Sequence, residues 1–151
     1  MRLSALLWRI IKSASAEADK SKTKARFIRA VFLGAFMSDF KSYLGKEVNI
    51  VIDRPLGSVH PNHGDIVYPV NYGYIPGTVS GDGKEIDVYL LGVSVPVRDF
   101  VCRIIAVIQR LDDNEDKLVA APMGTEFSKE EIESLTSFQE QYFDTKIITE
   151  V

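Results

Sequence analysis

Short β-prone runs, each closed by turn-forming residues, restrict this chain to a mostly β fold. The clearest runs are residues 48–52, 86–93, 103–109 and 117–121. After them, Ser128 and Glu131 have the spacing of a capping box, and apolar residues then recur at helical spacing. The pattern predicts an α+β domain, mainly β, in which a small closed or partly closed β-barrel carries a packed C-terminal helix.

A loop and an aromatic stretch separate the first two runs. Residues 56–64 are rich in glycine, proline and asparagine, so His60 and His63 are predicted to lie on a loop. Residues 68–75 are aromatic and predicted to form a strand. Its evenly spaced tyrosines would project to one side of that strand, and they are Tyr68, Tyr72 and Tyr74.

Charge divides the chain into two regions. Residues 1–36 hold eight basic and two acidic side chains, so with a net charge of −3 overall the region 37–151 carries −9. Basic residues interrupt the apolar stretches of residues 1–36, which argues against a membrane span there. Two interpretations stay open for this segment: an N-terminal extension outside the folded core, or an amphipathic transit peptide or surface-binding helix. The folded domain is predicted to be 37–151.

Composition bears on the cellular compartment and on the class of partner. Cys102 is the only cysteine, so no internal disulfide forms, and its apolar neighbours predict a buried structural thiol. A reducing, cytoplasmic location fits this usage. The acidic domain fits poorly with nucleic-acid binding, which needs a basic face. Nothing in the sequence decides whether the chain forms a homo-oligomer.

Carboxylates gather on two turns. Asp82 and Asp87 flank one turn, and residues 112–116 form a second, acidic turn. Hard divalent cations such as Mg²⁺ take oxygen ligands and often use few protein carboxylates, so a metal site is one interpretation and a solvated loop is the other. Lys117 and Arg54 are available to neutralise phosphate, and tyrosine hydroxyls can donate to it.

Four ordered motifs resemble one known family. Residues 68–75 read Tyr-Pro-Val-Asn-Tyr-Gly-Tyr-Ile, and ten residues after Tyr72 comes Asp-Gly-Lys-Glu-Ile-Asp at 82–87. The acidic turn then leads into Lys-Leu-Val-Ala-Ala-Pro at 117–122, and residues 138–142 form a tyrosine-ended helix segment. Over about residues 48–143 the chain resembles the soluble family I inorganic pyrophosphatases.

The resemblance implies a fold, a reaction and a site. The fold would be a five-stranded barrel of the oligonucleotide-binding type. The reaction would be Mg²⁺-dependent hydrolysis of pyrophosphate to two phosphates by a metal-activated water, with Mn²⁺ as the alternative ion. The implied metal ligands are Asp82, Asp87, Asp112, Glu115 and Asp116, with the register of the last two open. The implied catalytic residues are Asp87, Tyr72 and Lys117, and the implied substrate-binding residues are Lys117, Tyr68 and Tyr142.

The chain also departs from the family pattern. Lys84 stands where the signature has its middle aspartate, and Phe143 stands where a phosphate-binding lysine is expected. A compact loop replaces a longer hairpin and offers Arg54, His60 and His63 as substrate-binding residues instead. Two alternatives therefore stay open: a hydrolase acting on a nucleotide or sugar diphosphate, and a catalytically inactive binding module with the same barrel.

Overall fold

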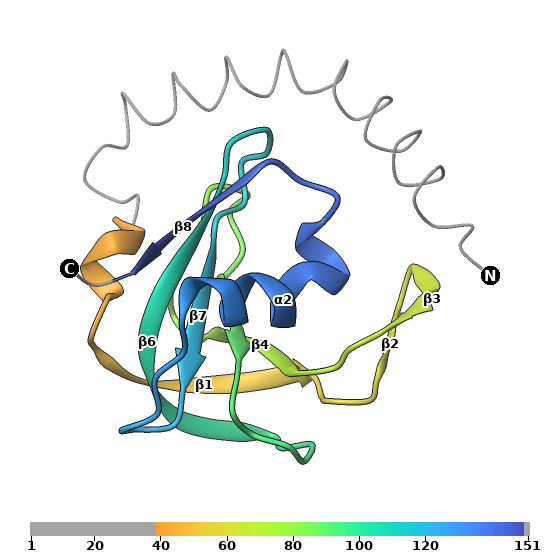
Figure 1. Cartoon of the computed structure of the whole chain (residues 1–151), viewed down its shortest axis with the longest axis horizontal. Helices are drawn as coiled ribbons and strands as arrows, with labels where there is room; N and C mark the ends of the chain where they lie inside the picture. Colours follow the sequence, from red (N-terminus) through yellow and green to blue (C-terminus); the bar gives the residue numbers. More distant parts are fainter. Residues whose placement is uncertain (1–38, 150–151) are drawn as a thin grey trace. The chain divides into compact units, whose positions relative to one another are not determined.

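Five strands close into a barrel in the computed structural model, which describes residues 39–149 (Figure 1). The predicted N-terminal extension, residues 1–36, lies outside the described residues. The strands follow one another around the barrel in the order β1 (Glu47–Arg54), β4 (Asn71–Ile75), β5 (Ile86–Leu90), β7 (Lys117–Ala121) and β6 (Asp99–Arg110). Pairing of β6 with β1 completes the ring, and this confirms the predicted five-stranded barrel.

The long strand β6 connects most of the sheet. Its first half pairs with β1, and its second half lies between β7 and β8 (Thr145–Thr149). Strand β8 is a correction, because the sequence predicted that the helix closes the domain. No alternation of buried and exposed residues marks β8, and only its pairing with residues 106–110 makes it a strand.

Three predicted strand boundaries also need correction. Strand β6 begins four residues before the predicted Arg103, and β5 ends at Leu90 because Gly92 turns the chain at positive φ. The aromatic strand begins only at Asn71, so Tyr68 precedes it. The backbone of Tyr68 bonds instead to Gly57 and Ser58, at 2.8 and 2.9 Å.

The predicted loop at residues 56–64 contains a hairpin, so the expectation of an irregular loop was wrong. Strand β2 (Val59–His60) pairs with β3 (His63–Val67), and His60 lies opposite His63 across a two-residue turn. The turn formers noted in the sequence mark that hairpin turn. The two strands form a sheet of their own that extends away from the barrel (Figure 1).

One α-helix, α2 (Lys129–Glu140), covers part of the barrel, and its predicted capping box is confirmed. The Ser128 hydroxyl accepts from the Glu131 N–H at 3.2 Å, and the Glu131 carboxylate accepts from the Ser128 N–H at 2.7 Å. Such a cap stabilises a helix by about 0.5–2 kcal/mol. The buried face of α2 places Ile132 among the apolar and aromatic residues of β5 and β7.

The barrel interior is apolar and tightly packed. Ile50, Val88 and Leu118 lie fully buried in it, and the predicted burial of Cys102 is confirmed. Burial raises the pKa of the Cys102 thiol to about 12. Where β4 crosses β1, a Cβ on Gly73 would lie 1.8 Å from the Val51 carbonyl oxygen, so only glycine fits there.

The chain also contains a short 3₁₀ helix, η1 (Phe40–Tyr43), which packs against the barrel core. Within residues 39–149, no helix has the length and apolar character required to cross a membrane.

Candidate active site

A buried lysine stands at the centre of the candidate site. Lys117 is the first residue of β7, and its ammonium group donates to Asp87 and, at 3.0 Å, to Glu115. Strands β5 and β7 run parallel with Val88 beside Leu118, and this register brings the preceding residues Asp87 and Lys117 together. The side chain of Lys117 is only 3% exposed, whereas those of Asp87 and Glu115 are 35% and 34% exposed.

Asp82 lies at the same site, on the turn before β5. Its carboxylate accepts from the Ser80 hydroxyl at 2.5 Å and from the Lys84 N–H at 3.0 Å, and it also interacts with Glu115. Burial acts to raise the pKa of Asp82, but these hydrogen bonds outweigh burial and lower the pKa. Three of the five predicted metal ligands, Asp82, Asp87 and Glu115, are therefore neighbours.

Tyr72 forms the inner wall of the site. Its ring lies 6.0 Å from the Lys117 ammonium, and its hydroxyl interacts with both Asp87 and Lys117. Burial raises the pKa of Tyr72 well above its ordinary value, so the hydroxyl keeps its proton. Burial acts to lower the pKa of Lys117, but the carboxylates of Asp87 and Glu115 help to raise it overall, so the ammonium stays charged.

Asp53 is a site residue that the sequence did not single out. It lies at an irregularity of β1, next to Arg54, whose register partner on β4 is Tyr72. The Asp53 side chain is exposed overall, but protein atoms crowd its carboxyl group and raise its pKa. The negative charges of Asp87 and Glu85 shift this pKa in the same direction.

The other two predicted metal ligands lie in the connection between β6 and β7. Asp112 accepts from the Asp144 N–H at 3.0 Å, and Asp116 accepts from the Arg110 N–H at 3.1 Å. These bonds hold the turn to the start of β8 and to the end of β6. Across residues 39–149, no three His, Cys, Asp or Glu side chains form a group arranged to ligate a metal.

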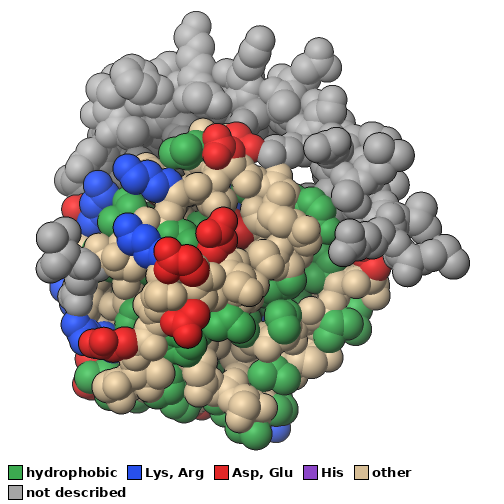
Figure 2. Space-filling view, viewed as in Figure 1, with side chains coloured by type: hydrophobic (Ala, Val, Ile, Leu, Met, Phe, Trp, Pro, Cys, Tyr) green, Lys and Arg blue, Asp and Glu red, His purple; other side chains and the backbone are tan. Residues whose placement is uncertain are grey.

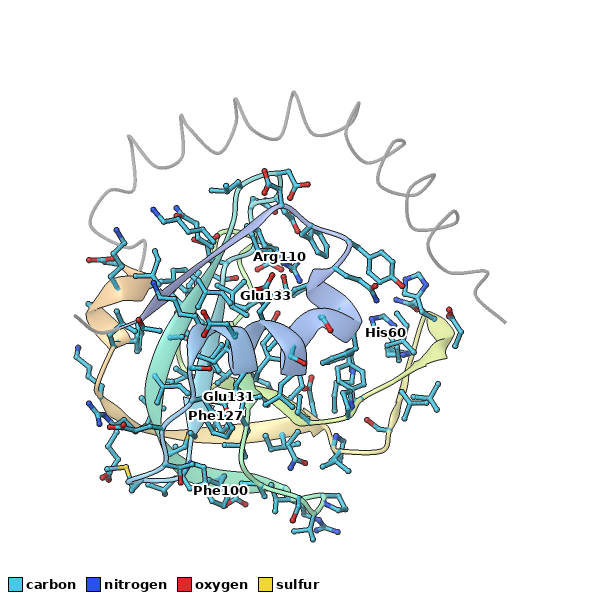
Figure 3. The ribbon with its side chains drawn as sticks, in the orientation of Figure 1. His60, Phe100, Arg110, Phe127, Glu131 and Glu133 are labelled. Atoms are coloured by element: carbon cyan, nitrogen blue, oxygen red, sulfur yellow. The ribbon has the colours of Figure 1, made fainter. Side chains whose placement is uncertain are left out.

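A second buried cation, Arg110, was also missed. Its guanidinium donates to Glu140 at 2.9 and 2.7 Å and to Asp113 at 3.0 Å, while the Phe143 ring lies 3.7 Å away. Burial acts to lower the pKa of Arg110, but Glu140 raises it overall. Arg110 lies near the C-terminal end of α2 (Figure 3). An arginine that ends an apolar strand was the one available sequence signal for this group.

Aromatic rings connect the site to the hairpin. Tyr68 lies 5.6 Å from Tyr72 and 6.1 Å from His60, whose ring is nearly parallel to its own. The Tyr68 hydroxyl donates to Gln139 of α2 at 3.5 Å. Tyr142 follows the end of α2, and its N–H donates to the Gln139 carbonyl at 3.5 Å. The predicted substrate-binding residues are thus divided between the hairpin, the barrel and the helix end.

Comparison with known proteins identifies the family. The family model described as inorganic pyrophosphatase matches residues 14–148. The chain belongs to the inorganic pyrophosphatase family. An inorganic pyrophosphatase from Xylella fastidiosa is 34% identical to it over 105 residues, which is 56% of this chain and 59% of that protein. The chain thus spans about three fifths of the length of such relatives.

Solved structures agree with this family fold. The inorganic pyrophosphatase from Ehrlichia chaffeensis superposes with a TM-score of 0.55 at 20% identity, covering 76% of this chain and 90% of that one. The inorganic pyrophosphatase from Neisseria gonorrhoeae gives 0.50 at 26% identity, covering 69% and 81%. The family's barrel is therefore present in residues 39–149, although this chain covers a shorter length than the curated relatives.

Proposed function

We propose that the chain is a Mg²⁺-dependent hydrolase that splits inorganic pyrophosphate into two phosphates, with Mn²⁺ as an alternative ion. One observation carries the proposal: Lys117 is buried beside Tyr72, while its carboxylate partners Asp87 and Glu115 reach solvent. Family membership and the names of its relatives support the same reaction.

The donor set fits magnesium with few protein ligands. Mg²⁺ binds oxygen, keeps several waters and is often held by one or two carboxylates together with substrate phosphates. Asp87 and Glu115 are partly exposed carboxylates that both accept from Lys117, so these two would hold the ion, and Asp82 lies beside Glu115. A bound Mg²⁺ supplies a more acidic water and neutralises charge on the phosphoryl oxygens.

The chain's own residues then bind and orient the substrate. Lys117 is positioned to donate to a phosphate oxygen that replaces one of its carboxylate contacts, and its burial strengthens that interaction. Tyr72 remains protonated and can donate a hydrogen bond from its hydroxyl. Packing of Tyr72 against Tyr68 and Tyr89 limits water on the inner side.

An organic diphosphate is the second candidate substrate. The cation Arg110 is fully engaged by Glu140 and Asp113, and Phe143 covers its guanidinium. Phe143 replaces a phosphate-binding lysine of the family pattern and Lys84 replaces a carboxylate of its metal-site signature, so fewer phosphate-binding cations and metal ligands remain for a highly charged pyrophosphate. A nucleoside or sugar diphosphate carries a substituent in place of some of that charge.

The surroundings of the site bear on partners and location. Acidic side chains gather on the outward face over α2 in Figure 2, and Glu131 and Glu133 belong to this helix (Figure 3). Such a face repels polyanions, which supports a small-molecule substrate over nucleic acid. The single buried Cys102 supports a reducing, cytoplasmic setting. Homo-oligomer formation stays a prediction.

Phosphate release tests the proposal directly. The full chain is assayed with pyrophosphate, ADP-ribose, nucleoside diphosphates and sugar diphosphates, each with Mg²⁺, Mn²⁺ or excess EDTA. For ADP-ribose the measured product is AMP, because its hydrolysis gives two phosphomonoesters and no free phosphate. We expect pyrophosphate hydrolysis with Mg²⁺, its loss in EDTA, and its loss in Asp87→Asn, because an amide lacks the charge that holds the ion. The matched control is Glu133→Gln on the exposed face of α2, which should keep wild-type activity.

The outcomes separate the candidates. Full activity of Asp87→Asn, or activity in excess chelator, would exclude the metal-hydrolase proposal. Activity on organic diphosphates alone would select the second candidate. Hydrolysis of none of these substrates, with retained pyrophosphate binding, would indicate an inactive binding module.

A further inference from the structure

Tyr72 of the candidate site lies directly opposite Tyr89 on the neighbouring strand. The antiparallel register of β4 and β5 makes these two residues cross-strand partners, and it places Tyr74 opposite Asp87. Side chains alternate along a strand, so Tyr72 and Tyr89 project from the same face of the sheet as Asp87. The two tyrosine rings meet edge to face, with their centroids 4.9 Å apart. Tyr72 therefore contacts the site through its hydroxyl and Tyr89 through its ring.

Tyr89 is anchored at its hydroxyl end. Its side chain is fully buried, and its hydroxyl donates to the Glu140 carboxylate at 2.5 Å. Glu140 also accepts two hydrogen bonds from the Arg110 guanidinium, at 2.9 and 2.7 Å. A buried carboxylate that accepts from three donors has a fixed position, because charge-assisted bonds of this kind are strong. Tyr89 is thus tied to the end of α2 and, through Arg110, to the end of β6.

Other aromatic rings restrict Tyr89 from the side. The Phe138 ring of α2 lies 5.9 Å from it and is almost perpendicular, at 89°. Edge-to-face pairs of this geometry are favourable, and a close-packed interior leaves little space for either ring to move. Tyr89 is therefore held at its hydroxyl by Glu140 and along its ring by Phe138 and Tyr72.

The Tyr72 ring depends on such support. Its hydroxyl interacts with both Asp87 and Lys117, so only a narrow range of ring orientations keeps both contacts. Tyr68 packs against Tyr72 at 5.6 Å, but the hydroxyl of Tyr68 makes only a 3.5 Å hydrogen bond. Tyr89 is the more firmly anchored of these two neighbours.

We propose that Tyr89 is a positioning residue for the proposed hydrolysis and that it acts through Tyr72. Its ring, tethered to Glu140, fixes the orientation of the Tyr72 ring. The Tyr72 hydroxyl then stays beside Asp87 and Lys117. This role rests on the proposed function, because it gives the tether a part in the same reaction.

A double-variant comparison tests this role. Pyrophosphate hydrolysis with Mg²⁺ is measured for Tyr89→Leu in the wild-type and in the Tyr72→Phe background. We expect Tyr89→Leu to lower kcat about tenfold in the wild type, because a small displacement of a positioned group is costly. In Tyr72→Phe the same change should lower kcat by less than about twofold, since the hydroxyl that Tyr89 positions is already absent. Tyr89→Phe keeps the ring and should recover most of the loss.

Ring mobility of Tyr72 gives a second result that does not depend on activity. In the metal-free full chain, nuclear magnetic resonance with labelled tyrosine measures how fast the Tyr72 ring flips about its axis. We expect flips at least about tenfold faster in Tyr89→Leu, because the smaller side chain leaves space beside the buried ring. Tyr89→Phe should stay closer to the wild-type rate, because it keeps the neighbouring ring.

Leu91→Ala is the matched control. Leu91 lies two residues after Tyr89 and is fully buried in the same cluster, so this variant opens a cavity there and leaves the Tyr89 ring in place. It should keep near wild-type kcat. Each variant is first checked by circular dichroism and cooperative unfolding. Should Tyr89→Leu lose its fold, Tyr89→Phe in the two backgrounds and its Tyr72 ring flips decide the outcome.

Three results would overturn the positioning role: equal losses of kcat in the two backgrounds, a loss in Leu91→Ala as large as that in Tyr89→Leu, or unchanged Tyr72 ring flips in Tyr89→Leu. Absence of hydrolysis by the wild type would reject the proposed reaction instead. Faster ring flips in Tyr89→Leu would then retain the hold of Tyr89 on Tyr72, and unchanged flips would reject that as well.

Discussion

Two buried cations show how differently this barrel uses the same kind of charge. Arg110 is surrounded by Glu140, Asp113 and the Phe143 ring; Asp113 is 27% exposed, but the Glu140 side chain, which holds the guanidinium by two hydrogen bonds, is only 5% exposed. Lys117 is equally buried, but about a third of each of its two carboxylate partners reaches solvent. We call Arg110 with Glu140 and Asp113 the closed group, because its main partner is buried. We call Lys117 with Asp87 and Glu115 the open group, because it can exchange a carboxylate partner for a ligand.

The difference separates a structural ion pair from a binding site. A two-pronged arginine–carboxylate pair between β6 and α2 fixes the helix end on the barrel. A lysine that makes single contacts to partly exposed carboxylates can release one of them at lower cost. Burial of a charge therefore does not by itself indicate a site, and we propose that the exposure of both carboxylate partners marks Lys117 as the binding group.

The largest effect is expected where the closed group is broken. Arg110→Met should lower the free energy of unfolding by about 3–5 kcal/mol, because it leaves Glu140 buried without its cation. Chemical denaturation measures the change. The double variant Arg110→Met, Glu140→Gln is the control and should recover much of the loss, because it removes the unpaired charge and keeps an acceptor for the Tyr89 hydroxyl. A loss below about 1 kcal/mol in the single variant would place Arg110 among the exchangeable cations.

Breaking the open group should affect stability less and catalysis more. Lys117→Met leaves Asp87 and Glu115 partly solvated, so we expect a loss of about 1–2 kcal/mol in the free energy of unfolding. Phosphate release should fall by about 100-fold or more, because a donor to the phosphoryl group is removed. Denaturation and a phosphate assay on the same preparation test both parts. Unchanged hydrolysis would remove Lys117 from the site.

A variant of Lys84 tests whether the open group extends to the turn at residues 82–87. Replacing Lys84 by Asp changes the local charge by two units, and a flexible exposed lysine relieves part of that difference by turning to solvent. If Lys84 faces the site, Lys84→Asp should tighten Mg²⁺ binding by about tenfold and raise pyrophosphate hydrolysis. Calorimetric Mg²⁺ titration of both proteins decides this. Equal affinities and rates would place Lys84 outside the site.

The smallest effect is expected at Asp53, whose negative charge slightly destabilises the folded state. Its folded-state pKa is raised, chiefly by burial, so its ionisation opposes folding above the ordinary value of 3.8. Asp53→Asn should therefore raise the free energy of unfolding at pH 7 by at most about 0.5 kcal/mol. The gain should vanish below pH 3.8, where Asp53 is protonated in both states. Denaturation at pH 3 and 7 measures it, and a gain of equal size at both would contradict the electrostatic cause.

The sequence predicted those elements whose signals are local. The barrel strands follow from short apolar runs between turns, and α2 follows from the capping box at Ser128 and Glu131. Strand β8 has no such signal, because its pairing with residues 106–110 depends on a partner about 40 residues away. The hairpin was missed because its turn formers outnumber the few β-prone residues beside them.

Site residues follow the same rule. Asp82 and Asp87 stand out because they share one turn, and the parallel register of β5 and β7 then adds Lys117. The pairing of Arg110 with Glu140 spans 30 residues, and neither residue has a local pattern that indicates the other. Asp53 lies at the irregularity in β1, and the charge that acts on it from Asp87 belongs to a residue far along the chain, so no local pattern indicates the interaction.

The pairing of β6 also has a consequence for how the barrel opens and forms. Residues 106–108 of β6 pair with β7 on one side and β8 on the other, so their backbone amides should be among the last to exchange with deuterium in the native protein. Closure of the ring requires β1 to meet residues 99–103, about 50 positions later in the chain. Contacts of such long range slow folding, so this small domain should refold on the millisecond-to-second scale of barrels rather than in microseconds.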